Sequence, residues 1–440
     1  MAAALSSRPA YGNALDGSER LRGERALREA LFIVFCDRVP EAFARLRNVS
    51  TSHWQELLRW LDMSGLALYF LDRMNELQST QWLPPAVLSR LQQNLADNTE
   101  RTQTLITESA GIQRKFQDAG LKYAILKGPS LCPLAVPRPE LRCQFDLDFL
   151  VADEDGISAR RILEERGYRL YPGHGGCLDA NSDAVWEFKR NEKPGVTLRD
   201  IYKAMPSYAV ELHIESRRPG QRSLLDHAWN RSLFGMQVPV LSPVDLFIAQ
   251  GMHAFKDIRS PFYRASQLLE FRRHVITHCD DKPFWQEVES LAAGDRSVHQ
   301  GLGVVILLIT NILGEFAPTS LTSWTVDRLR PAVRLWVEMY GRRSLFSLFP
   351  GTKLYLLLNR ELTAGERVSS PSFRRELLPI HFPRPAIQHL PGESMSFRLG
   401  RYRMYVSRIV SRIFLHTIEG LRCLWQARRF RRRVAALAKG

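Results

Sequence analysis

The sequence predicts an α+β fold in which a small mixed sheet is flanked by helical regions on both sides along the chain. Two short apolar runs, Tyr123–Lys127 and Phe145–Val151, have the length and composition of buried strands. Apolar residues recur at helical spacing before them, within Trp54–Leu77 and Val87–Ile112, and after them, within 222–345. Helical periodicity that gives way to strand patterns and then returns is typical of an α+β architecture.

The strand-containing region is expected to span residues 118–215. Its expected elements are, in chain order, strand Tyr123–Lys127, a short helix after Ser130, strand Phe145–Val151, helix Gly156–Arg166, strand Tyr168–Tyr171, a hairpin of Val185–Lys189 and Val196–Tyr202, and strand Tyr208–Ile214. The helix is expected to end at Gly167, because glycine commonly terminates helices. Pro194 and Gly195 mark the turn of the hairpin, since this pair of residues favours turns.

Composition divides the chain into six expected segments. They are a disordered N-terminus at 1–25, a helical region at 26–117, the sheet-containing core at 118–215, a second helical region at 216–359, an irregular connector at 360–397, and a basic amphipathic tail at 398–440. The connector is rich in Pro, Arg and Ser, which disfavour regular structure. With 440 residues, the chain has room for two or three domains and a sizeable core.

The overall composition is that of a globular protein, with 45% hydrophobic and 24% charged residues. The six cysteines are scattered and form no Cys-x-x-Cys pair, so neither a zinc ribbon nor a disulfide framework is indicated. The first twenty residues lack the apolar core of a signal peptide. The most apolar segment, Leu302–Leu313, is short for a membrane span and is expected to be a buried helix. We therefore expect a cytoplasmic protein.

The C-terminal tail carries most of the net charge. Residues 398–440 contain twelve Lys or Arg and one acid, Glu419, so this segment holds +11 of the chain's +15. Apolar residues recur in it at helical spacing, with arginines between them, which predicts a basic amphipathic helix. Such a helix either lies on an anionic membrane surface, here the inner face of the membrane, or docks on the protein body with its basic face in water. Nucleic acid is not an expected partner, because no aromatic platform accompanies the charge.

Asp146 and Asp148 lie two residues apart within the expected strand Phe145–Val151. Residues two apart on a strand share a face, so both carboxylates point one way while Leu147 and Phe149 pack on the other side. Neighbouring carboxylates repel each other unless a cation lies between them. Hard oxygen ligands suit Mg²⁺, which proteins often share with substrate phosphates. The pair therefore predicts a site for a metal ion and a phosphate group.

A turn that precedes the pair has the chemistry to hold phosphate. Gly128, Pro129 and Ser130 follow the first strand and can offer backbone N–H groups and a hydroxyl. Lys127, beside the turn, either neutralises phosphate charge or is an exposed lysine at the strand end. Arg142 either binds phosphate or fixes a carboxylate.

Other candidate residues favour structural roles. A second acidic triplet, Asp153-Glu154-Asp155, lies in a polar stretch where Asp favours turns and helix caps. His253 follows an apolar helical run, and both packing and substrate contact are open for it.

These residues, taken as a set, resemble a known family. The residues that carry the resemblance are Leu126-Lys127-Gly128, Arg142, Asp146-Leu147-Asp148, Leu150-Val151 and Gly167-Tyr168. They are similar to the bacterial family described as uncharacterised nucleotidyltransferases, within the polymerase-beta-like nucleotidyltransferase superfamily. The resemblance extends more loosely over about residues 55–315 and implies that the core at 118–215 is a nucleotidyltransferase core.

The resemblance implies roles for particular residues. Asp146 and Asp148 would hold two Mg²⁺ ions, and Glu211, as the third carboxylate, would complete the second metal site or act as a base. Asp146, Asp148 and Glu211 are thus both the catalytic and the metal-binding candidates. The expected cofactor-binding residues are Lys127, Gly128, Ser130, Arg142 and His213.

The implied activity is transfer of a nucleoside monophosphate from an NTP, such as ATP, to an acceptor that the sequence does not name. Two alternatives stay open. One is a non-catalytic nucleotide-binding or regulatory descendant, favoured by Phe145 where the family commonly has glycine and by Pro129 in the turn. The other is a membrane-surface scaffold that acts through the basic tail.

Overall fold

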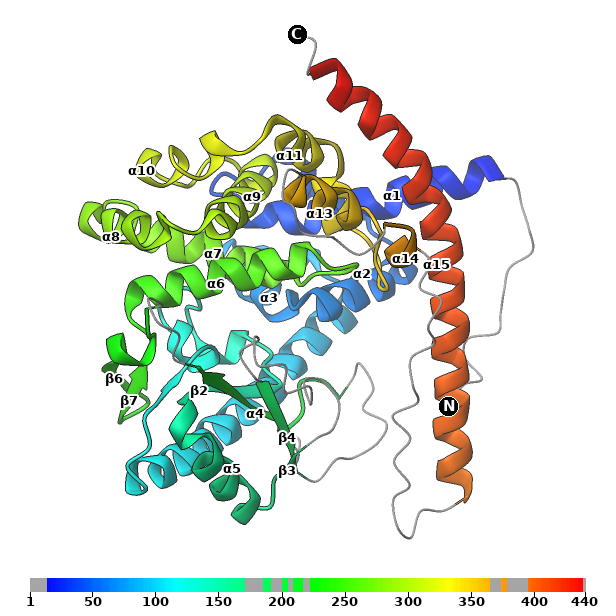
Figure 1. The fold of residues 1–440 in the computed structure, drawn as a ribbon. Coiled ribbons are helices and arrows are strands. Elements are labelled where there is room, and N and C mark those ends of the chain that lie inside the picture. Colours follow the sequence, from blue (N-terminus) through cyan, green and yellow to red (C-terminus); the bar gives the residue numbers. More distant parts are fainter. Residues whose placement is uncertain are drawn as a thin grey trace.

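The computed structural model describes residues 14–170, 185–190, 200–204, 209–216, 222–364, 373–377 and 395–437. Figure 1 shows a sheet near one end of the molecule, with helices packed on it and a larger helical body beyond. The fold is therefore α+β, with helices before and after the sheet along the chain, as the sequence predicts.

The strands and the helix among them lie between residues 123 and 240. They are β1 (Tyr123–Ile125), β2 (Asp146–Ala152), α5 (Gly156–Glu165), β3 (Arg169–Leu170), β4 (Val185–Lys189), β5 (Ala209–Glu215), β6 (Trp229–Leu233) and β7 (Met236–Val240). The short helix that the sequence predicts after Ser130 is a 3₁₀ helix that begins earlier, at Gly128, and ends at Leu131.

The remaining helices form the body and the C-terminal rod. They are α1 (Ala14–Phe32), α2 (Thr51–Ser64), α3 (Ala67–Glu76), α4 (Pro85–Asp118), α6 (Pro243–Ile258), α7 (Ala265–Thr277), α8 (Lys282–Ala292), α9 (Arg296–Leu313), α10 (Thr319–Thr322), α11 (Pro331–Trp336), α12 (Arg342–Leu345), α13 (Tyr355–Thr363), α14 (Phe373–Leu377) and α15 (Met395–Leu437).

The sheet is mixed, and the strands described in it have the order β3-β4-β5-β2-β1-β7-β6. At its centre β2 and β5 run parallel in unbroken register from Asp146–Ala209 to Ala152–Glu215. β1 pairs antiparallel with β2 and parallel with β7. This arrangement places the strand that carries the two aspartates beside the strand that carries Glu211.

Alternation along β2 explains its two faces. Leu147, Phe149 and Val151 pack into a core with residues of α4 and α5 such as Phe116 and Leu163. The opposite face, which carries Leu150 and Ala152, packs near the start of α6. The aspartates alternate with the first set and therefore lie on the α6 side of the sheet.

The helices before and after the sheet share one hydrophobic core, which includes Trp54 and Trp60 from α2 and Trp336 from α11. α9 lies inside it, with Val304, Leu308 and other residues fully buried, so this apolar segment is a core helix. Within the described ranges, α9 is the one helix whose length and composition alone would allow it to span a membrane.

Several expectations from the sequence are wrong in detail. β6 and β7 lie within 216–359, where we expected helices. They pair antiparallel and are joined by Phe234 and Gly235, which both have positive φ, as in a tight two-residue hairpin. β4 pairs with β3 and β5, and most of the expected partner strand Val196–Tyr202 lies outside the described residues. Residues 14–25 begin α1, although we expected the N-terminus to be disordered through residue 25.

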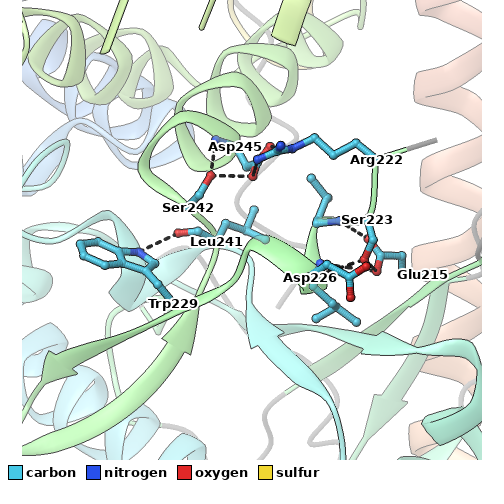
Figure 2. Close-up of polar contacts among 10 residues, drawn as sticks. Glu215, Arg222, Ser223, Asp226, Trp229, Leu241, Ser242 and Asp245 are labelled. Atoms are coloured by element: carbon cyan, nitrogen blue, oxygen red, sulfur yellow. Dashed lines mark hydrogen bonds and ion pairs between the residues drawn. The ribbon is translucent and has the colours of Figure 1, made fainter. Parts of the chain in front are cut away.

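Figure 2 shows the polar contacts that fix the entry to α6. Glu215, at the end of β5, accepts hydrogen bonds from the Ser223 hydroxyl at 2.9 Å and from the backbone N–H of Leu224 at 2.5 Å. At the start of α6, Asp245 binds Arg222 at 3.1 Å, while the Ser242 hydroxyl accepts from the backbone N–H of Asp245. These contacts hold α6 against the sheet face that carries the aspartates.

The stability of this sheet is expected to depend on the aromatic contacts behind the aspartates. Phe149 is 1% exposed, and its ring lies 5.5 Å from that of Phe116. Phe149→Ala should lower the free energy of unfolding by about 3–5 kcal/mol, because it leaves a cavity. Ile157→Ala on the surface of α5 is the control and should change it by less than about 0.5 kcal/mol. Urea denaturation measures both, and equal midpoints would contradict the assigned packing.

Candidate active site

The parallel register of β2 and β5 brings the candidate residues together. Asp148 lies directly opposite Glu211, and His213 is two residues further along the same face of β5. One ligand atom from each of Asp148, Glu211 and His213 lies within 4.8 Å of the others. The Nε2 atom of His213 is 3.4 Å from Asp148 Oδ1 and 3.4 Å from Glu211 Oε2. The three side chains thus form a compact chelating group.

The electrostatics of Asp148 and His213 are complementary. Burial alone would raise the pKa of Asp148, but its hydrogen bond with His213 and the ammonium of Lys127 hold that pKa well below its usual value. Lys127 Nζ donates to Asp148 Oδ1 at 3.0 Å. Burial opposes the charged form of His213, yet the contacts with Asp148 and Glu211 raise its pKa above the usual value. Lys127 and His213 therefore both stabilise the carboxylate form of Asp148.

Asp146 is the less compensated carboxylate. Burial, followed by the charges of Asp148 and Glu211, raises the pKa of Asp146 to about 6. A group held partly protonated beside two other carboxylates gains most from a cation that neutralises the site. The carboxylate oxygens suit a hard divalent cation such as Mg²⁺, while a nitrogen ligand from His213 would also suit Mn²⁺.

The turn at Gly128 depends on glycine. Its φ is +66°, a conformation that side chains disfavour, and a Cβ atom there would lie 2.3 Å from Nε2 of Gln144. That same amide nitrogen donates to the backbone oxygen of Asp146 at 2.6 Å. The turn and the aspartate strand are therefore held against each other through Gln144.

Ser130 is placed differently from the sequence prediction. Its side chain is fully buried, and its hydroxyl has no hydrogen-bond partner among the described residues. Its backbone oxygen accepts from Arg231 Nη1 at 2.9 Å. The hydroxyl is thus buried within the turn and is not exposed to solvent.

Arg142 fixes a carboxylate outside the aspartate pair. Its Nε lies 3.4 Å from Oε2 of Glu270 on α7, and the Tyr69 hydroxyl on α3 donates to the other Glu270 oxygen at 3.0 Å. Burial opposes the charge of Arg142, but Glu270 and Tyr69, followed by Asp146 and Asp148, raise its pKa. Arg142 therefore links the carboxylate site to the helical body through one buried guanidinium.

Sequence reasoning missed the roles of several neighbours. Glu187 on β4 lies opposite Glu211, and it pairs with Lys189 at 3.1 Å. The alternation of residues along β4 could have revealed the position of Glu187, whereas Tyr69 and Glu270 are too far from the aspartates in sequence to be linked to them by a local pattern.

His253, which lies on α6, is neutral. Burial, followed by the nearby charges of Lys127 and Arg142, lowers the pKa of His253 to about 3.

A cavity of about 370 Å³ has Glu270, the partner of Arg142, in its lining. Its lining includes Tyr69 and Asp72 from α3, and Glu270, Arg272 and Arg273 from α7. Arg272 binds Asp37 through Nη2 at 2.7 Å, and its buried Nε has no partner among the described residues. The cavity therefore combines the size of a small-molecule site with guanidinium donors.

Comparison with known proteins identifies similar chains. The family model described as "Uncharacterised nucleotidyltransferase" matches residues 50–309. One solved structure is described as "Crystal structure of an antigenic nucleotidyltransferase-like protein from Paracoccidioides brasiliensis". It is 14% identical, with 51% of this chain and 97% of that chain covered at a TM-score of 0.28. No curated protein matches the chain.

Gly128→Ala tests the turn. The added Cβ would collide with Gln144 and force the backbone out of positive φ, so we expect a destabilisation of about 1–3 kcal/mol and weaker NTP binding. Gly235→Ala is the matched control, because Gly235 also has positive φ but nothing lies within 4 Å of the added Cβ. Calorimetric NTP titration should show a loss for Gly128→Ala alone, and equal affinities for the two variants would contradict the assigned turn.

The raised pKa of Asp146 predicts pH-dependent metal binding. Asp146 is protonated below a pH of about 6 and must lose its proton to hold a cation, so affinity should rise with pH. We expect Mn²⁺ affinity to increase up to about tenfold per pH unit below the pKa of Asp146 and to keep rising above it, because His213, whose pKa is raised above its usual value, must also lose its proton to bind the ion. Asp146→Asn should weaken this dependence, and surface Asp153→Asn should not. Calorimetry from pH 5 to 8 measures it, and pH-independent affinity in the unmodified chain would refute it.

Proposed function

Because the chain belongs to the family of uncharacterised nucleotidyltransferases, we propose that it transfers a nucleoside monophosphate from an NTP, such as ATP, to an acceptor. The single observation that carries the proposal is the group of Asp148, Glu211 and His213, whose ligand atoms lie within 4.8 Å of one another between two parallel strands. Asp146, on the same strand face, adds a further carboxylate. Such a set of oxygen ligands fits a divalent metal ion, and we propose Mg²⁺.

Asp146, Asp148 and Glu211 would hold the metal, which when bound supplies a Lewis acid for the phosphate oxygens. The bond between the α-phosphorus and its bridging oxygen breaks as the acceptor oxygen bonds to that phosphorus, and pyrophosphate leaves. In the alternative role of base, Glu211 would take the proton of the acceptor hydroxyl, and Asp146 and Asp148 would then hold the metal without it. His213 would hold Glu211 in position through their 3.4 Å contact.

Lys127 and the backbone of the turn would bind the triphosphate. Lys127 already lies at 3.0 Å from Asp148, so its ammonium can shift from the carboxylate to a phosphate oxygen once a metal ion compensates Asp148. Gly128 allows the backbone to approach the phosphates closely. Arg142 is paired with Glu270, so its proposed role is to hold the electrostatic balance of the site.

The cavity beside Glu270 is the candidate place for the acceptor. It shares Glu270 and Tyr69 with the contacts that hold Arg142, and this shared pair supports the proposal. Its lining carries four carboxylates and three guanidinium groups, so it favours a polar acceptor and does not select for an anionic one. A cytoplasmic location is part of the proposal, and an anionic membrane surface is a second proposed partner, which depends on residues 398–440 and not on the carboxylate site.

Asp148→Asn tests the catalytic proposal. The loss of a metal-holding carboxylate should reduce nucleotidyl transfer on the order of 10³-fold, about 4 kcal/mol of transition-state stabilisation. The variant should also be less stable than the unmodified chain, because Lys127 and His213 lose the charge of their carboxylate partner, so circular dichroism must show that it is folded. Asp153→Asn, in the second acidic triplet, is the control. The assay incubates pure protein with labelled NTP, Mg²⁺ and host lysate and follows the label into acceptor.

The outcomes separate the three candidate functions. Transfer that Asp148→Asn abolishes and Asp153→Asn preserves supports the enzyme. Metal-dependent NTP binding without transfer would identify a non-catalytic nucleotide-binding descendant, and membrane binding without any nucleotide affinity would identify a scaffold. NTP binding that is unchanged in the Asp146→Asn, Asp148→Asn double variant would place the nucleotide site elsewhere.

A further inference from the structure

α15 has a continuous exposed apolar stripe. Leu437 is exposed on another side of the helix, and the other large apolar residues of α15 that the structure describes as exposed, each between 41% and 68%, are Met395, Leu399, Tyr402, Val406, Val410, Ile413, Phe414, Leu421, Leu424 and Trp425. At 3.6 residues per turn, these positions fall within an arc of about 140° of the helix surface. Soluble helices rarely leave such a stripe unpartnered, so its exposure indicates a binding surface.

The protein body covers a different side of this helix. Cys423, Ala427 and Phe430 are buried against it. The Cys423 thiol donates to the backbone oxygen of Lys353 at 3.3 Å, and the Tyr340 ring packs 5.8 Å from Phe430. Figure 1 shows α15 as a long rod along one edge of the molecule. The body therefore fixes the helix and leaves the stripe exposed.

The positive charge of α15 favours an anionic partner. Glu419 is the single acid of the helix, and it pairs with Arg422 at 2.6 Å. Arg412 and Arg422 are exposed outside the apolar stripe, and Arg403 is exposed within its arc. Pairing with a second copy of the helix would bring two strongly cationic surfaces together, whereas anionic lipid headgroups would neutralise them. An apolar stripe with arginines around it is the arrangement of a helix that lies in a membrane interface.

We propose that α15 binds an anionic membrane surface, with the stripe from Leu399 to Trp425 inserted at the boundary of headgroups and acyl chains. This places the helix in the plane of the membrane and the catalytic body on the aqueous side. The 43-residue helix is about 65 Å long, so it offers an extended contact. The inference does not depend on nucleotidyl transfer.

Co-sedimentation with lipid vesicles tests this inference on the full chain. One set of vesicles is phosphatidylcholine, and in the other about a quarter of the lipid is phosphatidylglycerol, which supplies the anionic charge. The unmodified protein should sediment with the anionic vesicles and release as salt increases. Val410→Asn with Phe414→Asn should lower the partition coefficient at least about tenfold, because both side chains lose their apolar insertion.

Further variants test the role of the arginines and the position of the helix in the membrane. Replacement of Arg403, Arg412 and Arg422 by glutamine should lower partition on the order of 10²-fold at low salt. Ile157→Asn is the control, since Ile157 is 62% exposed on α5, away from the helix, and its partition should not change. Brominated lipids should quench tryptophan fluorescence in the unmodified chain, and Trp425→Phe should remove most of that quenching.

Each contrary outcome overturns the proposal. Equal binding to neutral and anionic vesicles would remove the electrostatic basis. Partition that the stripe variants leave unchanged would place the membrane contact elsewhere. Concentration-dependent dimers in analytical ultracentrifugation that the Val410→Asn, Phe414→Asn variant abolishes, without lipid binding by the unmodified chain, would identify a second copy as the partner. Because NTP binding is measured separately, failure here leaves the catalytic proposal standing.

Discussion

The parallel pairing of β2 and β5 is the constraint on which the candidate site depends. Their register sets Asp148 opposite Glu211, and a shift of one residue would turn one of the two carboxylates into the core. Packing on the opposite face of the sheet fixes the register, because Phe149 and Leu212 must remain buried there. The hydrophobic core thus determines which polar atoms meet on the other side.

Bringing these carboxylates together has an electrostatic cost, and neighbouring basic groups reduce it. Lys127 and His213 contact Asp148 directly, and Arg142 adds positive charge from a site anchored by Glu270. A cation would replace part of this compensation, which frees Lys127 for phosphate. The helical body therefore contributes to the electrostatics of the site, because Glu270 and Tyr69, which hold Arg142, lie on helices and not on the sheet.

The periodicity of apolar residues predicted the parts of the fold that depend on neighbouring residues in the sequence. The alternation around Asp146 and the resemblance to the family placed the carboxylates correctly on one face. The hairpin at Phe234 was missed, because its strands are short and polar residues interrupt them. The contacts of Arg142 with Glu270 and of Glu270 with Tyr69 could not be predicted, since they join residues far apart in sequence through packing of helices. Ser130 appeared suited to phosphate by residue type, yet its burial depends on the tertiary structure.

The position of a bound metal ion tests the central claim most directly. A crystal of the full chain soaked with Mn²⁺, recorded at the manganese absorption edge, would locate the ion by anomalous scattering. We predict a peak about 2.2 Å from carboxylate oxygens of Asp148 and Glu211. A well-ordered peak that touches neither carboxylate, or no peak at saturating Mn²⁺ with β2 and β5 in the described register, would contradict the account.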